Sequence, residues 1–155
     1  MNNVDVRYGF TLGSETIDIA GTDARDINQI MIYRINSTNG NLTNITGSGL
    51  ITDWEPNGLC LHYNATIDKY YAFVNNKQGN VSQYYLYDGG DGLINGTLVR
   101  SFNVSSQPEG MVADDELGYI YVGEEDVGIW RFNASEDADD SRYFVDNTTT
   151  GHLTA

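Results

Sequence analysis

Short apolar and aromatic runs alternate with turn-forming residues along the whole chain. Between these runs the chain is rich in Gly, Asn and Asp, which favour tight turns. No stretch sustains apolar positions at helical spacing. Runs with the alternation and the Tyr, Ile, Val and Thr content of strands cover residues 30–35, 70–74, 84–88, 97–102, 119–123 and 128–132. The pattern therefore predicts an all-β fold made of antiparallel hairpins.

A repeat organises these runs. Residues 56–59 (PNGL) recur about 52 residues later as residues 108–111 (PEGM), and each copy is followed by a short apolar run and a turn. Further matching runs are 71–74 with 119–122 and 83–86 with 129–132, and a fainter first copy covers 17–20 and 32–35. A unit of about 50 residues with several short strands is typical of the four-stranded blades of a β-propeller.

About three such units fit into the 155 residues, which form one partial propeller domain over residues 1–155 and leave no room for a second domain. A propeller needs roughly 4–8 blades to close. We therefore expect the chain to be a fragment of a larger β-propeller, or to assemble with other copies. The alternative is an irregular β-sandwich in which the similarity between the units is accidental.

One predicted hairpin brings two carboxylates together. A strand over residues 110–113 returns over residues 119–123, and Gly118 suits a left-handed turn position between them. With a three-residue loop, the register places Glu109 directly opposite Glu125. Like charges in that relation are destabilising, and a bound cation would offset them. Calcium or magnesium is favoured over zinc because there is no Cys/His ligand cluster. The alternative is that both side chains extend into solvent.

The repeat extends this site to the neighbouring unit. It places Asn57 at the position of Glu109, and Lys77 at the position of Glu125. A carboxylate-bound metal beside a lysine suits an anionic substrate such as a phosphate ester, because charge must be neutralised during attack. A solvated surface lysine is the simpler alternative for Lys77 taken alone.

Charge and composition narrow the possible functions. Lys+Arg 8 against Asp+Glu 22 gives a formal net charge of −14, which excludes a nucleic-acid binder held by phosphate contacts. No apolar run has the roughly 20 residues of a membrane span, and the chain shows no signal peptide. Cys60 lies in an apolar run and is predicted to be a buried, inert thiol. Residues 114–116 are predicted to cap and solvate their turn, and residues 136–141 to form an exposed loop.

Nine Asn-x-Ser/Thr sequons point to export. One hypothesis is that the protein is secreted, to the outside of the cell or to a periplasm, and that some of these sites carry glycans. The alternative is a compositional drift toward Asn and Thr. The sequons begin at Asn36, Asn41, Asn44, Asn64, Asn80, Asn95, Asn103, Asn133 and Asn147.

The residues also resemble a known family. The segment SQPEGMVADDELGYIYVGEEDVGIWRF, at residues 106–132, is similar to the signature region of the β-propeller phytases. The opening NNVDVRYGF and the closing GHLTA resemble parts of that family in the same order, so the resemblance runs over residues 2–155. It implies a six-bladed propeller that binds several calcium ions and hydrolyses phytate, the hexakisphosphate of inositol, through attack of a calcium-bridging water. The chain would hold roughly the second to fourth blades of a parent expected to be monomeric.

The resemblance also assigns residues. Glu109 and Glu125 match carboxylates that bind active-site calcium, and they are the expected catalytic and metal-binding residues. Lys77 and Arg7 match positively charged residues that contact substrate phosphate. Asn57 stands where the family usually has a Tyr, and its carbonyl oxygen could still bind calcium.

Departures from the family leave other functions open. The family's early acidic motif and its later blades are absent, so the fragment alone is expected to be inactive. One alternative is a non-catalytic, secreted, calcium-binding propeller that acts as a binding module. Another is a calcium-dependent lactonase, by analogy of fold alone.

Overall fold

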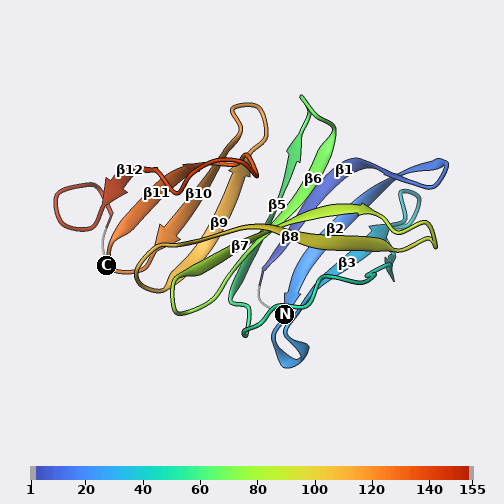
Figure 1. Cartoon of the computed structure of the whole chain (residues 1–155), viewed down its shortest axis with the longest axis horizontal. Coiled ribbons are helices and arrows are strands. Elements are labelled where there is room, and N and C mark those ends of the chain that lie inside the picture. The colour runs from blue at the N-terminus through green and yellow to red at the C-terminus, as the bar shows by residue number, and fades with distance from the viewer. Residues whose placement is uncertain (1–2, 154–155) are drawn as a thin grey trace.

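The fold consists of three four-stranded antiparallel sheets, seen in the computed structural model of Figure 1, which describes residues 3–153. The first sheet contains β1 (Val4–Leu12), β2 (Glu15–Ala24), β3 (Gln29–Ile35) and β4 (Leu42–Asn44). The second contains β5 (Gly58–Asn64), β6 (Lys69–Asn75), β7 (Asn80–Asp88) and β8 (Ile94–Asn103). The third contains β9 (Pro108–Asp114), β10 (Tyr119–Glu124), β11 (Gly128–Asn133) and β12 (Arg142–Asn147). A short 3-10 helix, η1 (Arg25–Ile27), joins β2 to β3.

This architecture confirms the predicted all-β fold with three four-stranded units. Within each sheet the strands are neighbours in chain order, as in a propeller blade. The repeat in the sequence corresponds to equivalent strands, because its matching runs lie in β6 and β10 and then in β7 and β11. The fainter first copy lies in β2 and β3. The alternative of an irregular sandwich is therefore wrong. The outermost residues of the segments NNVDVRYGF and GHLTA lie outside the described residues.

The first strands of the three sheets lie next to one another. β5 contacts both β1 and β9. β5 and β9 run in the same direction, since Gly58 lies near Glu109 at their starts and His62 lies near Asp115 at their ends. The loops that lead into β5 and β9 therefore meet at one end of the sheets, and the turns that follow them meet at the other end.

The hydrophobic core lies between the sheets. Side chains buried between the first and second sheets include Phe10, Ile19, Ile32, Leu61 and Leu86. Side chains buried between the second and third include Cys60, Phe73, Ile120, Val122 and Phe132. The second sheet is thus covered on both faces, and Figure 1 shows it between the other two. Burying one large apolar side chain contributes about 1.5–3 kcal/mol, so these two interfaces account for much of the stability.

The turn between β9 and β10 is one residue longer than predicted. The structure pairs Tyr119 with Asp114, so the four residues 115–118 form the turn in place of three. Gly118 has the predicted left-handed conformation, with a φ of +67°. The longer turn shifts the register of the whole hairpin by one residue.

A bulge shifts the register of this hairpin a second time. It lies between Val122 and Glu124, and Glu124 faces Pro108. The prediction that Glu109 pairs directly with Glu125 is therefore wrong. Alternation of side chains along a strand does not reveal a bulge, because the extra residue changes the pairing without changing the composition.

The sequon asparagines lie at the ends of strands or next to them. β4, β5, β8, β11 and β12 each end at one of them. In several sequons the Asn Oδ1 accepts a hydrogen bond from the backbone N–H of the Ser or Thr two positions later, as in an Asx-turn. These sequons begin at Asn36, Asn44, Asn64, Asn103, Asn133 and Asn147. Turn formation is thus a structural reason for the motif to recur.

Two further predictions concern Cys60 and the membrane. Cys60 is 1% exposed, and burial raises the pKa of its thiol, which confirms a buried, inert side chain. No helix within residues 3–153 has the length and apolar character needed to cross a membrane.

Candidate functional site

Glu109 and Glu125 border one hollow on the third sheet. Glu109 is the second residue of β9 and is exposed, and Glu125 directly follows β10. The hollow has a volume of about 420 Å³, and Asp126 and Thr148 also line it. Gln107 contacts both acidic residues. Its carbonyl oxygen accepts a hydrogen bond from Glu125 N at 2.8 Å, and its side-chain amide donates to Glu109 Oε1 at 2.6 Å. The two carboxylates therefore reach the same hollow without pairing across the strands.

Glu124 is a buried carboxylate beside this hollow. It is 4% exposed and accepts hydrogen bonds from Ser106 N and Ser106 Oγ, both at 2.7 Å, and from Trp130 Nε1 at 2.5 Å. These donors offset the cost of burying a charge. Glu124 thereby holds the loop before β9 against β10 and β11. The run of three acidic residues in the sequence gives no sign that its first member is the buried one.

Asn57 lies just before β5 and connects all three sheets. Its Nδ2 donates to the Pro108 carbonyl oxygen at 3.1 Å, and its Oδ1 accepts a hydrogen bond from Arg25 Nη2. Arg25 is the first residue of η1 and also donates to the Pro56 carbonyl oxygen at 3.1 Å. The structure thus places Arg25 at the end of the sheets where Glu109 lies. No pattern in the sequence marks Arg25, because a single arginine after a strand forms no motif.

Lys77 lies in the turn between β6 and β7 and is exposed. Asn76 stabilises this turn by accepting hydrogen bonds from two of its backbone N–H groups, both at 3.0 Å. β6 ends at Asn75, which pairs with Gly58. Lys77 therefore lies at the same end of the second sheet as Asn57, as the repeat predicts.

The second sheet also holds the backbone of Glu109. Asn75 Nδ2 donates to the Glu109 carbonyl oxygen at 3.2 Å. A Cβ atom on Gly58 would lie 2.5 Å from the same oxygen, so this close approach requires glycine. Asn75 Oδ1 is buried and has no hydrogen-bond partner within residues 3–153. A buried amide oxygen without a partner is thus present close to Glu109.

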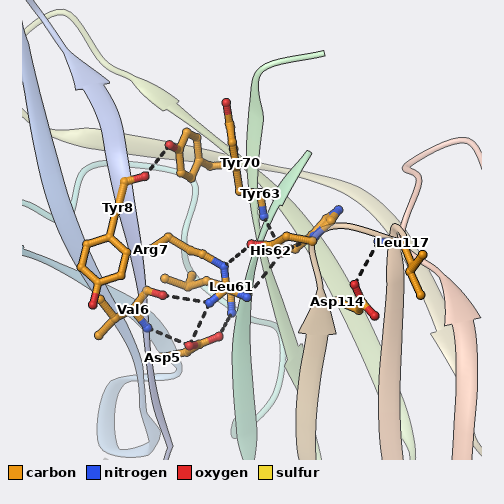
Figure 2. A network of polar contacts seen from close by, with 11 residues as sticks. Asp5, Val6, Arg7, Tyr8, Leu61, His62, Tyr63, Tyr70, Asp114 and Leu117 are labelled. Carbon is orange, nitrogen blue, oxygen red and sulfur yellow. Dashed lines mark hydrogen bonds and ion pairs between the residues drawn. The ribbon is translucent and has the colours of Figure 1, made fainter. Parts of the chain in front are cut away.

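Arg7 lies at the other end of β9 from Glu109, in the network of Figure 2. Its Nε is 2.8 Å from Asp115 Oδ2, and its Nη1 is 3.0 Å from Asp5 Oδ1. Asp115 follows Glu109 by six residues along an extended strand, or about 20 Å at about 3.3 Å per residue. The structure does not bring Arg7 together with Glu109 and Glu125. Its contact with substrate phosphate stays a prediction from the resemblance.

Asp115 joins the three sheets at this second end. It accepts a hydrogen bond from Tyr63 N at 3.1 Å and lies 2.8 Å from His62 Nδ1, both on β5, while it also binds Arg7 on β1. Figure 2 shows Arg7, His62 and Tyr63 in this network of polar contacts. The prediction that Asp115 only caps and solvates its turn is therefore wrong. Asp114 caps the turn, since its Oδ1 accepts a backbone N–H at 2.9 Å.

The ligands at the hollow suit a hard cation. Glu109 and Glu125 offer carboxylate oxygens to the hollow, which calcium and magnesium prefer to nitrogen or sulfur. Calcium takes about six to eight oxygen ligands. Within residues 3–153, no group of three or more His, Cys, Asp or Glu side chains lies close enough together to hold a metal ion. The chemistry of these residues fits calcium, and a full set of ligands needs further oxygens.

Comparison with known proteins identifies the family. The sequence model of the phytase family matches the chain over residues 1–155. The chain is 42% identical over 160 residues to the 3-phytase of Bacillus subtilis (strain 168). This match covers 100% of the chain and 42% of that relative, so the chain spans less than half of the relative's length. The chain belongs to the phytase family.

Proposed function

We propose that the full-length protein hydrolyses phosphate monoesters of phytate, myo-inositol hexakisphosphate, in a calcium-dependent reaction. The family and the Bacillus relative named 3-phytase support phytate as the substrate. The oxygen ligands at the hollow support calcium. Because the chain spans 42% of that relative, the activity is proposed for a closed propeller in which further blades complete the site.

In this proposal, the charged residues at the end of the sheets where Glu109 lies have separate tasks. Glu109 and Glu125 hold the calcium ion at the hollow. Calcium bound there polarises phosphoryl oxygens and lowers the pKa of a bound water. Lys77 and Arg25 bind and orient the phosphate groups, whose negative charge they offset. Glu124 keeps the loop before β9 in place through its hydrogen bonds to Ser106 and Trp130.

The observation that carries this proposal is the meeting of Glu109 and Glu125 at one hollow in a chain of the phytase family. The test is phosphate release from phytate by the full-length protein, with millimolar calcium and again after chelation. Release that requires calcium is the expected result. Release that survives complete chelation would contradict calcium dependence, and no release from a folded, calcium-bound protein would contradict the substrate.

A non-catalytic calcium-binding propeller is the second candidate. The observation that favours it is the side chain of Asn57, which Arg25 and Pro108 bind, where the family usually has a Tyr. Calcium binding without consumption of phytate or of any other phosphate monoester is the result that would support a binding module.

Export and glycosylation form a separate part of the proposal. Sequon asparagines that are exposed at strand ends and in hairpin loops include Asn36, Asn41, Asn44 and Asn133, and they are accessible to a modifying enzyme. Intact-mass spectrometry of protein from its native host, before and after glycosidase treatment, tests this. A mass loss that maps to these sites is expected. An unchanged mass equal to that of the bare chain would leave the Asx-turns as the explanation of the sequons.

A further inference from the structure

Asn57 is the residue through which Arg25 is connected to the strand that carries Glu109. Its side chain is 2% exposed and lies between η1 of the first sheet and the start of β9 in the third. Its oxygen accepts a hydrogen bond from the Arg25 guanidinium, and its nitrogen donates to the Pro108 carbonyl oxygen at 3.1 Å. Pro108 directly precedes Glu109, so one amide fixes both a cation and a carboxylate-bearing backbone.

The surroundings of Asn57 disfavour a metal ligand. An amide binds a cation through its oxygen, and here a guanidinium donates to that oxygen. A second positive charge at the same atom would repel the first. The backbone is also fixed, because Asn57 N donates to the Asn75 carbonyl oxygen at 2.7 Å. The hydrogen bonds of the side chain with Arg25 and with Pro108 would have to break before Asn57 Oδ1 could face an ion in the hollow.

The Arg25 side chain is held by hydrogen bonds and is partly exposed to solvent. Its Nε donates to the Pro56 carbonyl oxygen at 3.1 Å, and it lies 4.0 Å from Asp23 Oδ2. About a third of its side chain, 31%, is exposed, so an anion from solvent can reach the guanidinium. The orientation of the planar guanidinium decides how well it meets a phosphate group. A hydrogen bond from Nη2 to a buried amide fixes that orientation.

We propose that Asn57 is a positioning residue, which orients Arg25 toward the phosphate groups of the substrate and fixes the start of β9, and that it does not bind the metal. This proposal rests on the proposed hydrolysis of inositol phosphates only where it predicts an effect of Asn57 on the Michaelis constant for phytate. The structural part of the proposal is independent of activity. That part is that the Asn57 side chain and the Arg25 guanidinium stabilise each other through their hydrogen bond.

A double-mutant cycle with Asn57→Ala and Arg25→Ala in the full-length protein tests this proposal. Asn57→Ala should raise KM for phytate about tenfold with little change in kcat, as expected for the loss of a hydrogen bond to a charged group. The effect should largely vanish in an Arg25→Ala background. The calcium dissociation constant of Asn57→Ala, measured by titration calorimetry, should equal that of the wild type within a factor of two. Additive effects on KM together with weakened calcium binding would overturn the proposal.

A matched control separates this effect from the general loss of a buried amide. Gln83 is another buried side chain of the second sheet, and its Nε2 donates to the Ala134 carbonyl oxygen of the third sheet at 2.9 Å. Gln83→Ala should lower the unfolding midpoint and leave KM unchanged. If Gln83→Ala raises KM as much as Asn57→Ala, the specific role of Asn57 is refuted.

A second variant and a second readout keep the test decisive if Asn57→Ala fails to fold or phytate is not the substrate. Asn57→Asp keeps an acceptor for Arg25 and removes the donor to Pro108, so it should lower the unfolding midpoint and keep KM within about twofold of the wild type. Tighter calcium binding by Asn57→Asp would instead indicate a metal ligand. Denaturant unfolding of the wild type, the two single variants and the double variant measures the coupling free energy between Asn57 and Arg25 without any substrate. Coupling there with no phosphate release would contradict the proposed function alone, and no coupling would contradict the role of Asn57.

Discussion

Replacing Asp115 by alanine removes the carboxylate that joins the three sheets, so we expect a large loss of stability. The ion pair of Asp115 with Arg7 has an N–O distance of 2.8 Å, and the two side chains are 32% and 15% exposed. Asp115 also accepts the Tyr63 N–H and lies 2.8 Å from His62 Nδ1. Removing one partner of a fully buried ion pair costs about 3–5 kcal/mol. Since a third of Asp115 is exposed, the lower end of that range applies, about 3 kcal/mol.

Denaturant unfolding of the full-length protein measures this loss as a change in the free energy of unfolding. Asp115→Asn should cost less, about 1–2 kcal/mol, because the amide oxygen can still accept the Tyr63 N–H. Glu116→Ala is the matched control, since it removes a like charge from an exposed position of the same turn and should change stability by no more than about 0.5 kcal/mol. An Asp115→Ala variant no less stable than Glu116→Ala would refute the role of Asp115 in joining the sheets.

Three other predictions follow from individual contacts. Gly58→Ala should lower both stability and phosphate release, because its Cβ would lie 2.5 Å from the Glu109 carbonyl oxygen. Gly110→Ala is the control and should lower neither, because a Cβ there would have nothing within 4 Å. Equal unfolding curves and equal rates of phosphate release for the two variants would contradict the close approach. Lys77→Ala should raise KM for phytate about tenfold in steady-state assays, and an unchanged KM would remove Lys77 from substrate contact. Hydrogen bonds from two backbone N–H groups lower the pKa of Asp88 from 3.8. The stabilising effect of the ionised Asp88 carboxylate should be complete above pH 3.8 and should disappear as the pH falls through the lower pKa of the folded state. A carboxyl NMR titration that finds an unshifted pKa for Asp88 would contradict this prediction.

The arrangement of the strands was predictable because it follows from local patterns that repeat. Each sheet is built from four consecutive strands, so matching runs such as 71–74 and 119–122 occupy the same strand of successive sheets. The actual register around Glu109 and Glu125, which do not pair, was not predictable, because it depends on the length of a turn and on a bulge. Neither feature changes the alternation of apolar and polar residues, which is the signal that the sequence offers.

The site was predictable only where the repeat or the family motif marks a residue. Glu109, Glu125 and Lys77 lie at one end of the sheets, as the repeat indicates. Arg25 and Asp115 were missed because their partners lie on other sheets, at sequence separations that no local pattern encodes. From the sequence alone, an acidic residue in a turn is interpreted as a turn cap. Only the packing of β1 and β5 against the turn after β9 shows that Asp115 is an ion-pair partner.

The central claim is that Glu109 and Glu125 hold the calcium ion that phytate hydrolysis requires. The most direct test is titration of calcium into the full-length wild type, Glu109→Gln and Glu125→Gln, with phosphate release from phytate measured on the same samples. Each substitution removes one negative charge and keeps the shape of the side chain, so calcium affinity and phosphate release should fall together, by about tenfold or more. Wild-type calcium affinity in both variants, or full phosphate release without bound calcium, would contradict the claim.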